Sequence, residues 1–221
     1  MKNKIFTCLF GVAVFFFIIT FSIGLPIYCR FFYYLQINPL GLPEATGYSY
    51  DVIKSSFDAV LNYLTLPGYE FSTGVFAYSE SGKAHFADCK VLFDLNLIVL
   101  LISSAIMILT LILVKTKKIE LLRPLKMNVA FISALSIFAV AFILVIIVAI
   151  DFSSAFVVFH HLFFPGKTNW QFNPYVDEIL NILPEQFFMN CAILIGASIL
   201  IICLSIIIFQ LVKRRKESKK G

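Results

Sequence analysis

Four long apolar segments restrict how this 221-residue chain can fold. They span residues 5–28, 94–114, 127–150 and 187–212, and apart from Asp94 at the edge of the second they carry no charged side chain. Each is long enough to cross a hydrocarbon core of roughly 30 Å as a helix. Backbone groups in lipid must bond within their own segment, so helices are expected. With 60% hydrophobic and 14% charged residues, the composition excludes an ordinary soluble domain. The predicted fold class is therefore an all-α membrane protein with four transmembrane helices.

The apolar segments also predict the domain organisation. The first is longer than the core of a signal peptide and ends without a small-x-small cleavage site, so we interpret it as a retained helix. Two longer polar stretches, residues 29–93 and 151–186, then become loops on one side of the membrane. We expect a single integral membrane domain over residues 1–221.

The basic residues predict the orientation of the helices. Thirteen of the eighteen lie at the start of the chain, between the second and third segments from Lys115 to Lys126, or in the tail from Lys213 to Lys220. The positive-inside rule makes that side cytosolic. A multi-pass protein of the cell membrane is expected, with both termini cytosolic and residues 29–93 and 151–186 extracytoplasmic. The net charge of +5 then reflects contact with anionic membrane lipid and not nucleic acid binding.

Each outer loop contains an apolar stripe with helical spacing. The first predicts a helix at the membrane surface or under a cap, and the second predicts a short helix ended by Pro184. The first stripe comprises Tyr50, Ile53, Phe57, Val60, Leu61 and Leu64, and the second comprises Tyr175, Val176, Ile179, Leu180 and Leu183.

The sequence lacks the motifs that are typical of several classes of enzyme and metal site. The chain has no glycine-rich nucleotide motif, no G-x-S-x-G elbow and no H-E-x-x-H, and none of its five cysteines forms a C-x-x-C pair. Cys29 and Cys89 are both placed outside the cell, where a disulfide between them is one possibility. No apolar segment carries a charge near its middle, which argues against a transporter. We predict no cofactor and no metal.

The three histidines lie at the edges of the apolar segments. His85 precedes the second segment, and His160 and His161 follow the third. Asp88, three residues after His85, is a candidate for orienting that imidazole. One interpretation is a set of interfacial histidines without chemistry. A metal site from His85, Asp88 and His160 is another, although it lacks the usual ligand constellation.

Around these histidines the chain resembles the bacterial lipoprotein intramolecular transacylases. The resemblance spans nearly the whole chain and includes the number of helices and the order of the loops. A valine is expected where Cys89 stands, and this departure casts no doubt on the catalytic roles that the resemblance implies. The blocks that carry the resemblance are His85 to Lys90 with Leu92 and Phe93, Phe159 to Gly166 with Trp170 and Phe172, and Ile182 to Phe188.

The resemblance implies an acyltransferase with one catalytic histidine in each loop. The first is His85, and the family pattern Phe-His-x-x-Phe-Phe selects His160 over His161. It also implies that the outer loops form an extracytoplasmic cap. The implied substrate is a diacylated bacterial lipoprotein, whose sn-2 acyl chain moves to the α-amine of its N-terminal cysteine to give the lyso-form. No cofactor is needed, because conversion of an ester to an amide is favourable in free energy. The resemblance leaves open which histidine is the base and which is the acid. Phe163, Phe164 and Trp170 are candidate walls of the substrate pocket.

Two alternatives remain at this point. One adds a serine nucleophile, Ser153 or Ser154, and an acyl-enzyme. The other is a non-enzymatic four-helix membrane adaptor whose outer cap binds a partner. The adaptor predicts that the protein tolerates His85→Ala.

Overall fold

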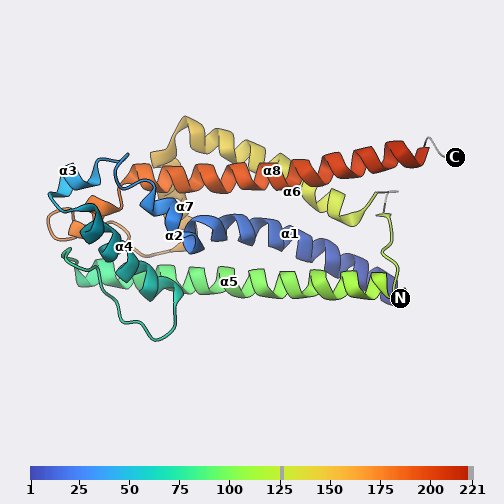
Figure 1. The fold of residues 1–221 in the computed structure, drawn as a ribbon, viewed down its shortest axis with the longest axis horizontal. Helices are drawn as coiled ribbons and strands as arrows, with labels where there is room; N and C mark the ends of the chain where they lie inside the picture. The colour runs from blue at the N-terminus through green and yellow to red at the C-terminus, as the bar shows by residue number, and fades with distance from the viewer. Residues whose placement is uncertain (125–126, 219–221) are drawn as a thin grey trace. The chain divides into compact units, whose positions relative to one another are not determined.

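The structure is a computed structural model that describes residues 1–124 and 127–218 (Figure 1). Within these residues the regular secondary structure is entirely helical. Lys126, Lys219 and Lys220 belong to the predicted cytosolic set and lie outside the described residues.

Four helices are long and apolar enough to cross a membrane, as the sequence predicts. The helices extend beyond the apolar segments, most clearly at α5, which begins at Glu80 and not near Asp94. The apolar segment marks only the part suited to lipid, whereas the first turns of α5 pack against other polar and aromatic segments. His85 therefore lies on a helix and not in a loop. The four helices are α1 (Lys2–Tyr28), α5 (Glu80–Lys115), α6 (Val129–Ile150) and α8 (Glu185–Ser218).

Shorter helices occupy the stretches predicted as outer loops. α4 confirms the first predicted stripe, because Ile53, Phe57 and Leu61 are buried on one face. The second stripe is shorter than predicted: a 3-10 helix buries Ile179, whereas Tyr175 precedes it and is 94% exposed. The shorter helices are α2 (Arg30–Tyr34), α3 (Leu42–Thr46), α4 (Tyr50–Thr65), α7 (Phe152–Phe163) and η2 (Glu178–Ile182).

The chain forms two compact units, and each of the four long helices contributes residues to both. Unit 1 comprises the described residues of 1–23, 96–146 and 195–221, and unit 2 comprises residues 24–95 and 147–194. The single domain predicted for residues 1–221 stays a prediction.

Unit 1 is a bundle of apolar helices with close helix contacts. A Cβ on Gly11 of α1 would lie 2.5 Å from the side chain of Val129, so only glycine fits there. At the same place Ser133 Oγ donates to the Gly11 carbonyl over 2.9 Å. Small residues and hydroxyl bonds of this kind join helices in lipid. The buried core contains Phe10, Val14, Ile18, Ala134, Ile137 and Cys203.

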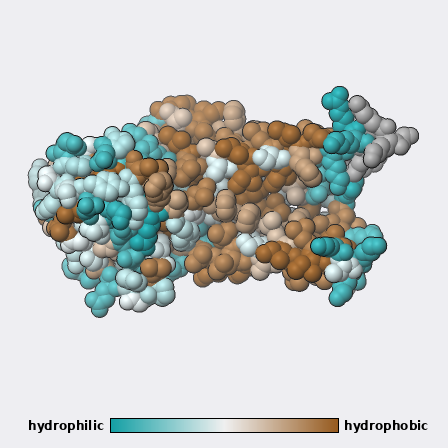
Figure 2. Space-filling model, viewed as in Figure 1, coloured by the Kyte–Doolittle hydropathy of each residue, from teal (hydrophilic) through white to brown (hydrophobic). Residues whose placement is uncertain are grey.

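The outer face of the unit 1 helices is apolar. Figure 2 shows hydrophobic side chains over their visible face. Large aliphatic side chains are exposed there, among them Leu101 on α5, Ile143 on α6 and Ile201 on α8. An exposed apolar surface of this extent suits contact with lipid chains and not with water.

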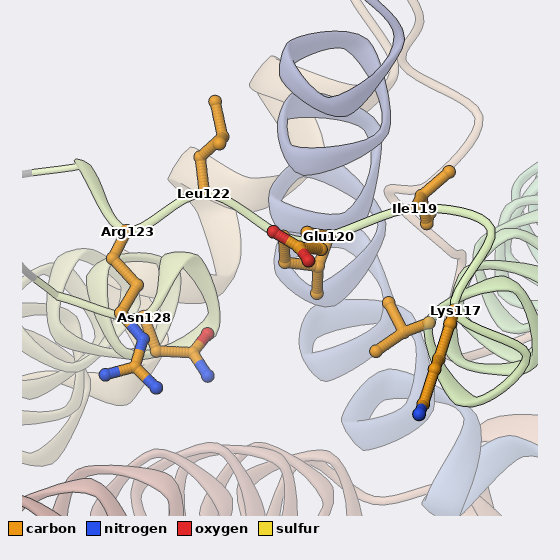
Figure 3. A pocket seen from close by; sticks show the side chains of 8 residues that line it. Lys117, Ile119, Glu120, Leu122, Arg123 and Asn128 are labelled. Carbon is orange, nitrogen blue, oxygen red and sulfur yellow. The ribbon is translucent and has the colours of Figure 1, made fainter.

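Unit 1 also holds a cavity of about 640 Å³ at the connection between α5 and α6 (Figure 3). Its walls carry charged and amide side chains, and no histidine is among them. This cavity is therefore separate from the histidine chemistry predicted above. The lining residues are Val114, Lys117, Ile119, Glu120, Leu121, Leu122, Arg123 and Asn128.

Unit 2 has a hydrophobic core of its own, centred on an aromatic cluster. The ring of Tyr33 stacks on Phe57 with centroids 3.6 Å apart and meets the edge of Phe187 at 5.1 Å. Its hydroxyl is buried and donates to the carbonyl of Ile182 over 2.7 Å. One residue thereby joins α2 to α4, η2 and the start of α8, so unit 2 can position side chains accurately.

The five cysteines, all within the described residues, are free. The disulfide considered between Cys29 and Cys89 is therefore not formed. Cys29 is exposed, whereas the sulfur of Cys89 lies against the ring of His85.

Candidate active site

Two of the three histidines meet in the interior of unit 2. His85 projects from the second turn of α5, and His160 from the last turn of α7. Their ring centroids are 5.5 Å apart, with the ring planes inclined by 37°. His85 is 5% exposed and His160 6%, so both imidazoles are shielded from water. Residues 75 positions apart in the chain thus form one buried pair.

The orientation of His160 follows from the geometry of α7. Asp151 caps this helix by accepting from the backbone N–H of Ser154 over 3.0 Å. The helical repeat then places the carbonyl of Phe156 2.7 Å from His160 Nδ1. A carbonyl oxygen only accepts, so Nδ1 carries a proton. In the neutral ring Nε2 then keeps its lone pair, for which the described residues provide no donor. Burial lowers the pKa of His160 below its usual value, although the bond to Phe156 acts in the opposite direction.

His85 is also held as a neutral imidazole. It precedes the apolar segment of α5, which spans residues 94–114. Burial is the main reason that its pKa falls to about 4, and the neighbouring His160 lowers it further. Its Nε2 lies 3.4 Å from the sulfur of Cys89. Its Nδ1 is buried and has no hydrogen-bond partner in the described part of the chain.

Aromatic rings form the walls around the pair. Phe164 lies 4.9 Å from His85, centroid to centroid, and 5.7 Å from His160. Phe172 meets the edge of His85 at 5.5 Å, and Trp170 lies 4.9 Å from His160. Two of the three predicted wall residues, Phe164 and Trp170, therefore contact the histidines.

The third predicted wall residue, Phe163, lies elsewhere. Its side chain is 47% exposed, and its ring contact is with Phe159 at 4.6 Å. Phe163 and Phe164 are neighbours at the end of α7, and adjacent residues on a helix do not share a face. Only Phe164 can turn inward with His160.

Asp88 bonds to the second outer loop and not to an imidazole. Its carboxylate accepts from Lys167 Nζ, and from Asn169 Nδ2 over 2.9 Å. Partial burial raises the pKa of Asp88, but these two bonds outweigh it and hold that pKa below its usual range. Asp88 thereby fastens residues 167–169, which lead into Trp170, to the helix that carries His85. Its influence on His85 is through charge.

Comparison with known proteins identifies the family. The model of the family described as "Lipoprotein intramolecular transacylase Lit" matches residues 8–188. The chain belongs to the Lit family. The resemblance drawn from the sequence is thereby confirmed, as is the enzyme class, an intramolecular acyltransferase. No curated protein matches the chain.

Solved structures of Lit from Bacillus cereus are similar to the chain over nearly its full length. One describes that protein as membrane integral; it is 26% identical, with 97% of this chain and 98% of that chain covered and a TM-score of 0.81. Two variants of the same protein, with one histidine replaced by arginine or by alanine, are 25% and 26% identical, with a TM-score of 0.72 in both cases. They cover 98% and 97% of this chain and 95% and 96% of theirs. These likenesses confirm the all-α, multi-pass membrane fold.

The third histidine of the chain faces outward from the pair. His161 is exposed, and its ring meets Trp170 edge-on at 5.3 Å. It follows His160 directly on α7, so the two side chains leave the helix in different directions.

The serines considered as nucleophiles lie at the opposite end of α7. Ser153 Oγ donates to Glu185, and Ser154 takes part in the cap at Asp151. His160 follows Ser153 by about two helical turns, a rise of roughly 10 Å. Neither serine contacts a histidine, so the geometry gives no support to an acyl-enzyme.

Three residues beside the histidines were not predicted as site residues from the sequence: Cys89, Phe156 and Phe172. Cys89 and Phe156 each lie four residues from a histidine on the same helix, a spacing that does indicate contact once the helix is known. Phe172 reaches His85 through tertiary folding, which no local pattern reveals. Among residues 1–124 and 127–218 no three His, Cys, Asp or Glu side chains cluster as metal ligands would.

Proposed function

We propose that this protein moves the sn-2 acyl chain of a diacylated lipoprotein to the α-amine of its N-terminal cysteine, with His160 as the base and His85 as a hydrogen-bond donor to the reacting ester. The observation that carries the proposal is the buried pair itself, in which His160 Nδ1 is held by the Phe156 carbonyl and burial lowers the pKa of both rings. Family membership supplies the reaction class.

In the first step the amine attacks the ester. An α-amine has a pKa of roughly 7.7–8.0, so a neutral fraction exists at neutral pH. As its nitrogen bonds to the acyl carbon, His160 Nε2 accepts one N–H proton and becomes an imidazolium. The carbonyl oxygen gains the negative charge of the tetrahedral intermediate. A neutral His85 offers one ring N–H to that oxygen, in the manner of an oxyanion hole.

In the second step the bond between the acyl carbon and the glyceryl oxygen breaks. A glyceryl alkoxide leaves poorly unless it is protonated, and His160 returns its proton to that oxygen. The products are an amide and a free glyceryl hydroxyl, and His160 is again neutral. Because the pKa of His85 is about 4, His85 holds no second proton to donate at neutral pH. The acid and base roles that the sequence left open thus fall to one histidine.

The size of the ring that forms in the transition state explains why a rigid pocket would increase the reaction rate. The amine nitrogen, Cα, Cβ, sulfur, two glyceryl carbons, ester oxygen and acyl carbon form an eight-membered ring in the transition state. Such rings close slowly in solution because few conformers bring the ends together. Walls made by Phe164, Phe172 and Trp170 would restrict those conformers, and orientation of this kind contributes strongly to rate.

The placement in the membrane is part of the proposal. The charge bias predicts that unit 2 forms an extracytoplasmic cap with the site at the outer face, where membrane lipid and lipoprotein substrate meet. We expect no nucleic acid partner.

Cysteine labelling tests this placement. In a background without native cysteines, a membrane-impermeant maleimide should label Glu70→Cys in intact cells and leave Lys118→Cys unlabelled until the cells are opened. Both positions are exposed, so accessibility within the protein is matched. If only Lys118→Cys were labelled in intact cells, the protein would have the opposite orientation in the membrane.

The pH dependence follows from the lowered histidine pKa values. Protonating His160 would stop the reaction because it removes the base, but the lowered pKa of His160 moves that loss below the ordinary 6.5. Above pH 6.5 the rate should then follow the titration of the substrate amine. A plot of log rate against pH is expected to fall with a slope of one below about pH 8. A slope of two that begins near pH 6.5 would mean that a histidine titrates normally.

The reaction itself is tested by the lipid form of lipoproteins. Mass spectrometry of a lipoprotein from cells that express the chain should show one acyl chain on nitrogen and one on glycerol, and cells without it should show both on glycerol. Unchanged lipoproteins despite stable expression would refute the proposed activity and favour the adaptor.

A further inference from the structure

Cys89 is the polar neighbour of His85 along its own helix. It lies one turn further along α5, and its sulfur is 3.4 Å from His85 Nε2. No other hydrogen bond to either ring nitrogen of His85 is found among the described residues. His85 itself is 5% exposed, so bulk water does not reach Nδ1. The thiol is therefore the group placed to decide where the ring proton sits.

We propose that Cys89 is a positioning residue that fixes the tautomer of His85, by donating its S–H to Nε2 and keeping the ring proton on Nδ1. The inference rests on the proposed function, in which His85 donates a hydrogen bond to the reacting ester. It assigns that donation to one atom, Nδ1.

The direction of the bond follows from the two groups. A neutral imidazole nitrogen is a good acceptor, whereas a thiol sulfur accepts weakly. Burial raises the pKa of the Cys89 thiol to about 12, with the charge of Asp88 acting in the same direction, so the sulfur keeps its proton at neutral pH. With Nε2 accepting from sulfur, the single ring proton of a neutral His85 must be on Nδ1.

The two histidines then offer complementary hydrogen-bonding groups to the substrate, an acceptor on His160 and a donor on His85. His160 has Nδ1–H occupied by the Phe156 carbonyl and Nε2 free to accept. His85 has Nε2 occupied by Cys89 and Nδ1–H free to donate. A buried donor without a partner is costly, and a substrate oxygen that accepts from it removes that cost. The transacylation needs one such acceptor and one such donor.

Nitrogen NMR of the full-length protein in detergent tests the assignment. With ¹⁵N-labelled histidine, a protonated and an unprotonated ring nitrogen have well-separated shifts, and single-histidine variants assign the three rings. We expect His85 to show a protonated Nδ1 and an unprotonated Nε2. A wild-type His85 protonated at Nε2 would overturn the proposal.

Two substitutions of Cys89 complete the test. Cys89→Ser keeps a donor at Nε2 and should preserve the tautomer. Cys89→Val removes the donor at similar volume and should shift the tautomer ratio toward Nε2–H by roughly fivefold, as expected for one neutral hydrogen bond. Throughout, His160 should stay protonated at Nδ1, because its carbonyl partner is untouched; this is the control for an intact fold. An unchanged His85 ratio in Cys89→Val would overturn the proposal.

The rate links the tautomer to catalysis. Cys89→Val should lower kcat in proportion to the fraction of the Nδ1–H tautomer that is lost, with KM unchanged, and Cys89→Ser should restore it. A shifted tautomer with an unchanged kcat would show that Cys89 has no positioning role in the reaction. If the proposed function were wrong, His85→Ala would instead keep full activity. The tautomer measured by NMR does not depend on that activity.

Discussion

Replacing either buried histidine by alanine is expected to abolish transacylation, with a loss of about a hundred- to ten-thousand-fold each. His160→Ala removes the proposed base, whose orientation is set by the bond from Nδ1 to the Phe156 carbonyl. His85→Ala removes the buried donor beside it. The measurement is the fraction of lyso-form lipoprotein by mass spectrometry at matched expression.

His161→Ala is the matched control, because it removes the same side chain from the next position of α7. His161 is exposed and contacts only the edge of Trp170 among the aromatic rings, so substantial activity should remain. A dead His161→Ala beside an active His160→Ala would show that the wrong histidine was chosen. If His85→Ala and His160→Ala both kept full activity, the protein would be no histidine-dependent enzyme, and the adaptor would be favoured.

Asp177→Ala should cause the second large effect, a loss of stability in unit 2. Asp177 is 1% exposed; Oδ1 accepts from the backbone N–H of Ser79 over 2.6 Å and Oδ2 from that of Asn173 over 2.9 Å. Alanine removes the buried acceptor of both hydrogen bonds, at a cost of about 1–3 kcal/mol for the two together. Ser79 directly precedes α5, which carries His85, and Asn173 follows Phe172. Activity should therefore fall together with stability.

Thermal unfolding in detergent measures the stability, with Asp51→Ala as the control. Asp51 is an exposed carboxylate in the same unit, in the first turn of α4, and its removal should change the free energy of unfolding by no more than about 0.5 kcal/mol. If Asp177→Ala unfolded at the same temperature as Asp51→Ala, the carboxyl group would not be what holds the two segments together.

The number and type of the long helices were predictable because lipid imposes one strong condition on the backbone. The helix of residues 50–65 was also predictable, since its buried face repeats with the helical period. The start of α5 was not. Residues 80–93 mix charges with Phe86 and Phe93, and only tertiary packing makes that stretch continue the helix.

The sequence selects candidate site residues but does not reveal the geometry that brings them together. The motif around His160 selects one histidine of an adjacent pair, and the helix geometry places that one inward. No local pattern indicates that Lys167 and Asn169 bond to Asp88, or that Asp177 joins two loops, because these contacts join residues far apart in the chain. The role of Cys89 was missed because it depends on which ring nitrogen faces the thiol.

The aromatic surroundings of the two imidazoles also bear on the fate of the acyl group. An ester next to a base can be attacked by two nucleophiles, the substrate's own amine and water. Attack by water would release the acyl chain as a free fatty acid. Both rings are almost completely buried among Phe156, Phe164, Phe172 and Trp170, which leaves little room for a competing water molecule. The amine arrives tethered to its ester, whereas water would have to enter separately. Dryness at the histidines thus favours transfer over hydrolysis.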